Sequence, residues 1–197
     1  DHIIEPVAGF RDALTRAFEV AEFRPRGLVT MGVVPTDPNT GFGYLRRAEE
    51  LPDLPGAWRV AEFREKPNRT TALDYVASGQ YWWNAGMFVW RTALLLELLE
   101  TLVPDTARKV RRIAADPQLI DELFPTLLKT SVDYAVMQPA STGAGEAEVL
   151  AVPLAISWSD VGSFQNLAAQ FALDEHGNRR DGVTVTLDAN GCILINT

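Results

Sequence analysis

The residues best suited to chemistry are single polar side chains placed where predicted strands end. They are Asp1, Gly43, Glu65, Lys66, Asn84, Asp133 and Asp160. Carboxylates bind a hard cation such as Mg²⁺, and a lysine ammonium pairs with a phosphate as a point charge. Ligands of α/β sheets bind in a crevice outside the strand ends. If these side chains converge on one crevice, they suit a metal-dependent site for a sugar phosphate.

Each of these residues also has an ordinary structural explanation. Asp160 lies in Trp158–Ser163, which we predict to be a tight turn after the apolar run Val149–Ile156, and an aspartate there caps backbone N–H groups as readily as it binds metal. Glu65 and Lys66 are also typical of a solvated charge pair at a strand end. A buried Asn84 needs partners, which are either backbone groups or ligand hydroxyls. The residues alone leave both explanations open.

Several other chemistries find no support in the sequence. Two histidines, His2 and His176, and one cysteine, Cys192, form neither a zinc motif nor a Ser-His-Asp set. No Gly-rich loop of the Walker or dinucleotide type occurs. The single cysteine rules out an internal disulfide and fits a reducing compartment, so we expect a cytoplasmic protein.

The composition is that of an ordinary globular protein. The 197 residues are 47% hydrophobic and 22% charged, with a net charge of −8. An acidic surface argues against binding to nucleic acid or to an anionic membrane, and no apolar run reaches transmembrane length. The sequence opens at Asp1 without an initiator methionine and ends inside an expected strand, so we expect a fragment of a longer protein.

Alternating helices and strands predict an α/β sheet that positions these residues. Helical spacing of apolar residues predicts a helix over Val7–Phe23, and a β-branched run predicts a strand over Leu28–Val34. The other predicted strands are Trp58–Phe63, Tyr81–Trp90 and Glu148–Pro153; the other predicted helices are Thr70–Ala77, a proline-broken Thr92–Lys129, Ser131–Met137 capped by Ser131, and Phe164–Phe171. Arg46–Gly56 is a polar stretch before the strand Trp58–Phe63, and we assign no element to it.

The last residues differ from this α/β body. Thr184–Leu187 and Cys192–Ile195 flank the turn residues Asp188–Gly191, which predicts a β-hairpin. We therefore expect a main domain over residues 1–175 and the start of a small β extension over residues 176–197.

Six segments in a fixed order resemble a known family. They are Asp1-His2, Gly41–Tyr44, Phe63–Pro67, Trp83–Phe88, Ser131–Met137 and Trp158–Ser163. Together they resemble mannose-1-phosphate guanylyltransferases, also called GDP-mannose pyrophosphorylases, within the sugar nucleotidyltransferases. Each segment alone is common; their order along nearly the whole chain is specific. Trp83–Phe88 and Ser131–Met137 favour the mannose branch over the glucose and thymidylyl relatives.

The resemblance implies a GT-A-like nucleotidyltransferase fold, a Rossmann-like mixed sheet flanked by helices. It implies that mannose 1-phosphate and GTP give GDP-mannose and pyrophosphate by in-line attack assisted by Mg²⁺, and it is compatible with a homodimer. Matched by motif, Asp1 and Asp160 would bind the metal and Lys66 the sugar phosphate. The mannose-binding residues would be Gly43, Glu65 and Asn84, with Asp133 binding substrate or only shaping the site. Positioning and electrostatics would supply the rate.

The chain departs from the family at its start. The Gly-rich loop and base-binding residues of the family would lie before Asp1, so the chain resembles the sugar-binding part and we expect little transferase activity from it alone. Two alternatives stay open: a glucose-1-phosphate nucleotidylyltransferase, and a noncatalytic regulatory subunit that binds sugar nucleotides. The sequence does not fix the nucleotide base.

Overall fold

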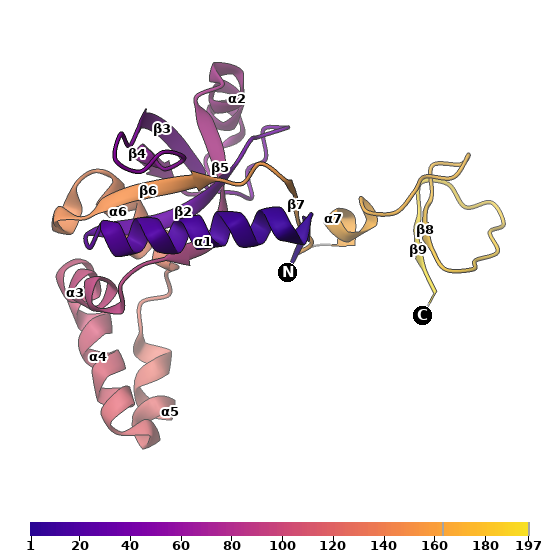
Figure 1. Cartoon of the computed structure of the whole chain (residues 1–197). Coiled ribbons are helices and arrows are strands. Elements are labelled where there is room, and N and C mark those ends of the chain that lie inside the picture. The colour runs from indigo at the N-terminus through magenta and orange to yellow at the C-terminus, as the bar shows by residue number, and fades with distance from the viewer. Residues whose placement is uncertain (163, 197) are drawn as a thin grey trace. The chain divides into compact units, whose positions relative to one another are not determined.

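The computed structural model describes residues 1–162 and 164–196, and the chain divides into two compact units (Figure 1). The central unit comprises Gly9–Ala155. The terminal unit joins the two ends of the chain, Asp1–Ala8 and Ile156–Thr197. The boundary that we predicted between residues 175 and 176 stays a prediction.

A five-stranded sheet forms the centre of the central unit. Its strands are β2 (Gly27–Val33), β3 (Tyr44–Glu50), β4 (Trp58–Arg64), β5 (Tyr81–Val89) and β6 (Glu148–Pro153). The order is β2-β5-β3-β4-β6, and a short β4–β6 pairing closes the sheet into a barrel. β2 and β6 run parallel, whereas the other neighbours are antiparallel.

The hydrophobic core explains why these strands pair as they do. Every residue of β2 is buried, which fits its continuous apolar run. The core side chains Leu28, Leu45, Phe63 and Trp82 pack against Leu98 of a neighbouring helix. The sheet therefore offers a rigid frame for polar side chains at its edges.

The helices and turns of the central unit connect and cover this sheet. The helices are α1 (Val7–Phe23), which begins in the terminal unit, α2 (Arg69–Ser78), α3 (Thr92–Leu102), α4 (Pro104–Ala115), α5 (Ile120–Leu123) and α6 (Gln138–Ser141), with 3-10 turns at Pro117–Leu119, Phe124–Thr126 and Ala144–Glu146 and a π-helical turn at Asp133–Met137. Asn68 caps α2 by accepting from the Thr71 N–H at 2.9 Å. Gly79 ends α2 in the left-handed conformation that favours glycine.

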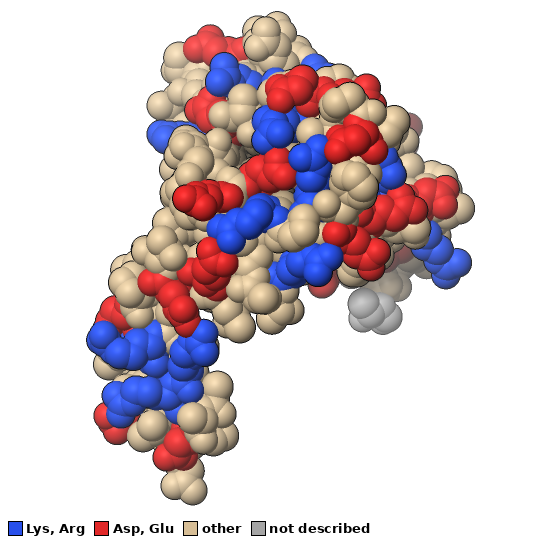
Figure 2. All heavy atoms as spheres, turned by 60° about the vertical axis from the view of Figure 1, so that its left-hand side comes forward, with Lys and Arg blue, Asp and Glu red and all other residues tan. Residues whose placement is uncertain are grey.

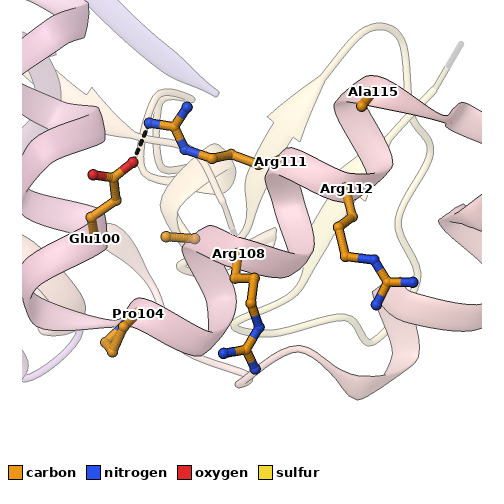
Figure 3. A pocket seen from close by; sticks show the side chains of 7 residues that line it. Glu100, Pro104, Arg108, Arg111, Arg112 and Ala115 are labelled. Atoms are coloured by element: carbon orange, nitrogen blue, oxygen red, sulfur yellow. Dashed lines mark hydrogen bonds and ion pairs between the residues drawn. The ribbon is translucent and has the colours of Figure 1, made fainter.

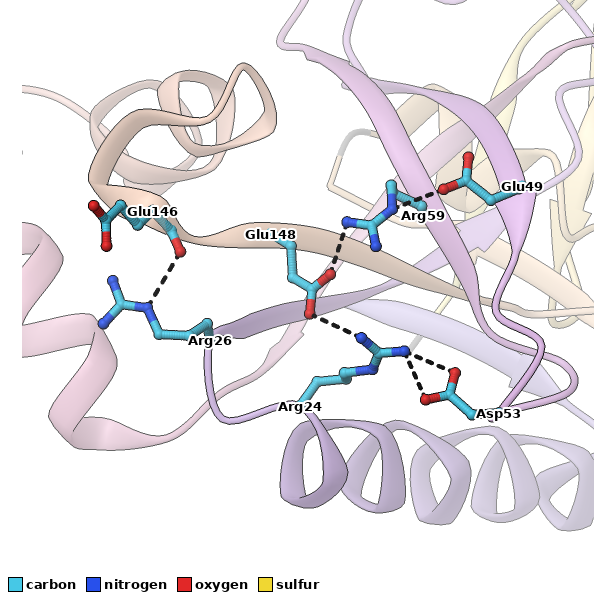
Figure 4. A network of polar contacts seen from close by, with 7 residues as sticks. All are labelled: Arg24, Arg26, Glu49, Asp53, Arg59, Glu146 and Glu148. Atoms are coloured by element: carbon cyan, nitrogen blue, oxygen red, sulfur yellow. Dashed lines mark hydrogen bonds and ion pairs between the residues drawn. The ribbon is translucent and has the colours of Figure 1, made fainter.

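A network of ion pairs ties α1, β4 and β6 together at the surface (Figure 4). Glu148 of β6 accepts from Arg59 of β4 at 2.8 Å and lies 3.9 Å from Arg24, which follows α1. Arg24 also donates to both oxygens of Asp53, at 2.7 and 2.8 Å. Partly exposed pairs contribute about 0–1 kcal/mol each, so the network fixes geometry more than it adds stability.

The described part of the terminal unit contains two small sheets and, besides the start of α1, one short helix. β1 (His2–Glu5) pairs antiparallel with β7 (Ser157–Asp160), and β8 (Arg179–Asp181) pairs parallel with β9 (Ile193–Ile195). The helix α7 spans Phe164–Ala168. None of the described helices combines the length and the apolar character needed to cross a bilayer.

The α/β fold class and most predicted elements are confirmed. The helix Val7–Phe23 and the strand Glu148–Pro153 have the predicted bounds. The polar stretch Arg46–Gly56, to which we assigned no element, contains most of β3. That strand was missed because its outer residues are charged, and they are stabilised by cross-strand pairs such as Arg46 with Glu62, 3.8 Å apart.

Three predictions for other segments were wrong. Trp158–Asp160 is strand β7 rather than a turn, because these residues pair with β1 from the far end of the chain. Thr184–Leu187 is not a strand, and β9 pairs in parallel with β8, so no hairpin forms about residues 188–191. Ser131 does not cap a helix with its side chain; the turn that follows is π-helical and its cap residue is Val132. Ser163, the last residue of the predicted turn, lies outside the described residues.

Candidate functional site

Gly43 lies between Glu65 and Asn84, next to the start of β3 and the end of β4 and within reach of β5. Tyr44 of β3 is paired with Arg64 of β4 and with Trp83 of β5. One position further in these antiparallel registers, Gly43 is opposite both Glu65 and Asn84, and the Asn84 N–H donates to the Gly43 carbonyl at 2.8 Å. Cross-strand neighbours share one face of a sheet. Glu65 and Asn84 thus flank a position that has no side chain.

Because Gly43 has no side chain, the Glu65 carboxylate can occupy the space over its Cα. A Cβ at Gly43 would lie 2.5 Å from Glu65 Oε2 and 3.3 Å from Asn84 Cβ. Real Cβ atoms do not approach an oxygen that closely, so any larger residue would displace the carboxylate. Gly43 is buried, and Glu65 is only 8% exposed.

The Asn84 side chain is held by three groups from different parts of the central unit. Its Oδ1 accepts from the Thr30 hydroxyl at 2.7 Å and from the Gly86 N–H at 3.2 Å. Its Nδ2 donates to Asp133 Oδ1 at 3.2 Å. Because an N–H faces Oδ1 and a carboxylate faces Nδ2, the amide has one satisfied orientation.

An irregularity in the pairing of β5 with β2 brings the Asn84 side chain within reach of Thr30. The register between β2 and β5 shifts between Thr30 and Gly32, so that Gly32 faces Asn84 whereas Thr30 faces Phe88. Gly86 lies within the extra residues of β5 and has a φ of 71°. Only glycine adopts that conformation at little cost. Bulges of this kind re-aim side chains next to functional sites.

Asp133 reaches the same cluster from the π-helical turn Asp133–Met137. The Gln138 N–H donates to the Asp133 carbonyl across this wide turn. The turn precedes Pro139, whose ring would clash with a carbonyl in a regular α-helix. Gln138 also accepts from the Glu65 N–H at 3.1 Å, so it joins Asp133 and Glu65 from one short segment.

Glu65 and Lys66 form the charged part of the cluster. Lys66 Nζ lies 3.4 Å from Glu65 Oε1, and the Lys66 side chain is 55% exposed. Burial raises the pKa of the Glu65 carboxyl, and the nearby charge of Asp133 raises it further, whereas Lys66 lowers it. Lys66 has a φ of 44°, a left-handed conformation that is strained for a side-chain-bearing residue. Such strain is often kept at binding sites.

Asp1 and Asp160 lie in the terminal unit, at the end of the β1–β7 pairing. The Val161 N–H donates to the Asp1 carbonyl at 2.8 Å, and Asp160 is opposite His2. Their backbones are therefore one register position apart. Asp160 Oδ1 accepts from the Gly162 N–H at 3.0 Å, which is the capping contact considered in the sequence. Whether the two carboxylates share one cation stays a prediction.

The donor set at this edge suits a metal that brings further ligands with it. Asp160 Oδ1 is engaged by an N–H, whereas Asp1 is exposed. Among residues 1–162 and 164–196, no group of three or more His, Cys, Asp or Glu side chains is arranged to hold a metal ion. Mg²⁺ is commonly bound by one or two carboxylates together with waters and substrate phosphates. Two aspartates fit that pattern and do not form a closed protein site.

A separate cavity of about 580 Å³ lies along α4, where Lys and Arg side chains gather (Figure 2). Arg108, Arg111 and Arg112 line it, but they point in different directions (Figure 3). Arg111 is paired with Glu100, and Arg108 with Asp105. Because the three guanidinium groups do not converge, this cavity is not a built anion site.

Comparison with known proteins decides the family. Residues 1–177 match the family model described as nucleotidyl transferase. The chain belongs to this family. It is 41% identical to the mannose-1-phosphate guanylyltransferase of Escherichia coli over 187 residues, which cover 90% of this chain and 37% of that protein. It is 37% identical to the xanthan biosynthesis protein XanB of Xanthomonas campestris over 95% of this chain and 39% of that protein.

Two solved structures are similar to this chain in fold. A crystal structure described as a mannose-1-phosphate geranyltransferase from Thermus thermophilus superposes with a TM-score of 0.74 at 32% identity, over 90% of this chain and 49% of that chain. One described as a mannose-6-phosphate isomerase from Helicobacter pylori gives a TM-score of 0.66 at 26% identity, over 81% of this chain. The chain thus spans less than half the length of the curated relatives it matches.

The structure joins most of the predicted site residues of this nucleotidyl transferase into one cluster. We call it the Gly43 cluster; its members are Gly43, Glu65, Lys66, Asn84 and Asp133. We expected all of them at strand ends, and this holds for Gly43, Glu65 and Lys66 but not for Asn84. Gly43 precedes β3, Glu65 and Lys66 follow β4, and Asn84 lies within β5. They meet because antiparallel registers align a strand start with a strand end.

Sequence reasoning missed two residues that hold the cluster, Thr30 and Gln138. Thr30 lies in an apolar run, where its lone hydroxyl is a weak signal that a polar partner lies nearby. Gln138 directly follows Ser131–Met137, a segment that was noted for its predicted helix, its family resemblance and Asp133, but Gln138 itself was not singled out. Neither signal names the partner, because Asn84 and Glu65 are more than 50 residues away in sequence.

Proposed function

We propose that this chain is the sugar-binding part of a mannose-1-phosphate guanylyltransferase. Such an enzyme transfers GMP from GTP to mannose 1-phosphate and gives GDP-mannose and pyrophosphate. The family and the names of the relatives support this reaction class. The observation that carries the proposal is Gly43, which lacks a side chain between the carboxylate of Glu65 and the amide of Asn84.

The Gly43 cluster offers complementary groups to a sugar. Glu65 accepts hydrogen bonds, and the amide of Asn84 donates them, so neighbouring hydroxyls of mannose find one partner of each kind. Both side chains are largely withdrawn from water, with exposures of 8% and 7%, so hydrogen bonds made there are not exchanged freely with solvent. The exposed ammonium of Lys66 holds the phosphate of the sugar phosphate as a point charge.

The chemical step needs no covalent intermediate with the protein. An oxygen of the sugar phosphate attacks the α-phosphorus of GTP in line. The bond from that phosphorus to the oxygen bridging to the β-phosphorus breaks, and pyrophosphate leaves with the electron pair. Lys66 fixes the attacking phosphate, so its contribution is orientation. In the proposal Asp1 and Asp160 hold Mg²⁺, which when bound neutralises negative charge on the phosphates.

A competition experiment tests the sugar part of this proposal. We expect mannose 1-phosphate to bind at least about tenfold more tightly than glucose 1-phosphate, because the two differ at one hydroxyl and one buried hydrogen bond is involved. Isothermal titration calorimetry measures both affinities. Equal affinities, or tighter binding of glucose 1-phosphate, would replace the mannose assignment with the glucose-type one.

The nucleotide part is tested by pyrophosphate release in the full-length protein. GTP with mannose 1-phosphate should support turnover, whereas the 197-residue chain by itself should release little pyrophosphate. Binding of mannose 1-phosphate with no turnover in the full-length protein would favour a noncatalytic regulatory subunit. Cytoplasmic location and a homodimeric state stay predictions.

A further inference from the structure

We propose that Thr30 is a positioning residue that locks the Asn84 side chain so that the amide can only donate to the sugar. This inference deepens the proposed function and rests on it for the identity of the ligand. Thr30 lies in β2, outside the segments that carry the family resemblance, and is 1% exposed. Its hydroxyl lies 2.7 Å from Asn84 Oδ1.

The two acceptor positions of Asn84 Oδ1 are both taken. The Thr30 hydroxyl fills one and the Gly86 N–H fills the other. A carbonyl oxygen has two lone pairs, so Oδ1 has no capacity left for a ligand. What Asn84 offers to a ligand is therefore its N–H₂ group. Within the described residues, the structure gives that nitrogen one acceptor, Asp133 Oδ1, and leaves its second hydrogen for a sugar hydroxyl.

Thr30 adds something that Gly86 alone does not supply. Gly86 belongs to the irregular part of β5, with its left-handed backbone, whereas Thr30 belongs to a strand that is buried along its whole length. The hydrogen bond from Thr30 therefore holds the Asn84 amide in a fixed position relative to the buried strand β2 at the centre of the barrel. The Met87 carbonyl lies 3.1 Å from the Thr30 hydroxyl, further away than Asn84 Oδ1 at 2.7 Å, so the single hydroxyl hydrogen goes to Asn84.

A polarisation effect accompanies the geometric one. Accepting two hydrogen bonds at Oδ1 draws electron density from the amide and makes its N–H hydrogens stronger donors. Asp133 takes one of these hydrogens, and the other faces the ligand. The Thr30 hydroxyl thus strengthens the Asn84 N–H₂ group as a hydrogen-bond donor, although Thr30 itself does not touch the sugar.

The test uses a graded series at position 30. Thr30→Ser keeps the hydroxyl, Thr30→Cys replaces it with a weak S–H donor, and Thr30→Val keeps the shape without a donor. We expect the affinity for mannose 1-phosphate to stay within about twofold in Thr30→Ser and to fall about tenfold in Thr30→Val, with Thr30→Cys between them. Thr101→Val is the control, because it removes a hydroxyl that donates to a carbonyl in α3 at 3.0 Å.

A spectroscopic measurement separates this inference from the proposed function. The Asn84 side-chain amide resonances, observed by ¹H–¹⁵N NMR, should exchange with solvent several-fold faster in Thr30→Val than in wild type or Thr30→Ser. That readout needs no ligand, so it holds even if mannose 1-phosphate fails to bind and the proposed function is lost. If Thr30→Val does not fold, the Ser and Cys variants give the same comparison. Unchanged exchange rates in Thr30→Val, or equal exchange in the Ser and Cys variants, would overturn the lock.

Discussion

The Gly43 cluster and the β1–β7 edge carry the predicted chemistry, and they are built in different ways. In the Gly43 cluster, side chains from β2, β5 and the π-helical turn bond to one another, and Thr30, Glu65 and Asn84 are buried. At the β1–β7 edge, Asp1 and Asp160 are brought near each other by backbone pairing alone. Asp1 is exposed and Asp160 half-buried.

This difference matches the ligands that the two regions are expected to hold. A sugar hydroxyl is neutral and is recognised by the direction of its hydrogen bonds, so its partners must be oriented before it arrives. A divalent cation is held by charge, and its coordination is completed by waters and phosphates. The Gly43 cluster is therefore organised in advance, whereas the carboxylate edge need only supply charge. Each prediction below perturbs one of these two regions.

The largest expected effect is on turnover when the carboxylate edge loses its charge. Asp160→Asn keeps an oxygen that accepts from the Gly162 N–H, so the local turn should persist. We expect turnover of the full-length protein to fall by about 1,000-fold, because electrostatic stabilisation of the phosphates is lost. The affinity for mannose 1-phosphate should not change.

Asp181→Asn is the matched control, because it removes an exposed carboxylate from β8 in the same unit. Turnover assays and calorimetry on both variants complete the comparison. Unchanged turnover in Asp160→Asn would remove the metal assignment, and a parallel loss of sugar affinity would remove the division of labour between the two regions.

The next effect is a loss of sugar binding from one added methyl group. In Gly43→Ala the new Cβ would lie 2.5 Å from Glu65 Oε2, so the carboxylate must leave its position. We expect the affinity for mannose 1-phosphate to fall about 100-fold, since one misplaced group disturbs the whole arrangement. Calorimetry measures this directly.

Gly41→Ala is the control in the same loop. Its Cβ would contact Asn39 Oδ1 at 3.1 Å and no residue of the Gly43 cluster. That variant should bind the sugar phosphate as wild type does. Comparable losses in both variants would mean that the loop, and not the space over Gly43, determines binding.

The two regions also differ in how much of them the sequence predicts. Strong local signals, such as the helical spacing over Val7–Phe23 and the apolar run of β6, give the correct elements because those signals act within a few residues. The site residues of the Gly43 cluster were listed from their chemistry, and their roles came from a family resemblance. Their chemistry alone favoured a solvated charge pair at Glu65 and Lys66. Local signals cannot show which of these side chains meet.

What the sequence does not contain is the register between strands. Thr30 and Asn84 touch because two extra residues in β5 shift its pairing with β2. Gln138 reaches Glu65 because a wide turn aims it there. At the chain ends, β7 was taken for a turn because its partner β1 is about 155 residues away. Such pairings depend on long-range packing, which no local pattern encodes.

A smaller effect follows from the raised pKa of Glu65. Burial and the neighbouring Asp133 raise the pKa of this carboxyl above its ordinary value of 4.5, and Lys66 opposes them. The folded state therefore favours the protonated form, and its contribution to stability is lost as pH rises from 4.5 through the raised pKa. Thermal unfolding should show that Glu65→Gln gains stability relative to wild type as pH rises over this range, and that the gain shrinks below pH 4.5.

Glu49→Gln gives the opposite sign and serves as the control. A backbone hydrogen bond and Arg59 lower the pKa of Glu49, so its charged form is favoured in the fold. Its contribution is present above the ordinary pKa and is lost as pH falls. A Glu65→Gln variant with the same pH dependence as Glu49→Gln would contradict the buried carboxylate at the Gly43 cluster.

The smallest effect separates the stability of the Gly43 cluster from its function. Gln138 accepts from the Glu65 N–H at 3.1 Å, and Ser141 accepts from the Phe63 N–H at 3.0 Å, so α6 bonds to Phe63 in β4 and to Glu65 just after β4. Gln138→Ala and Ser141→Ala each remove one such bond, and each should lower the free energy of unfolding by about 1 kcal/mol. The affinity for mannose 1-phosphate should fall about threefold in Gln138→Ala alone, because only that bond fixes the backbone that carries the Glu65 carboxylate. Equal affinities in the two variants would show that β4 holds Glu65 in place without help from Gln138.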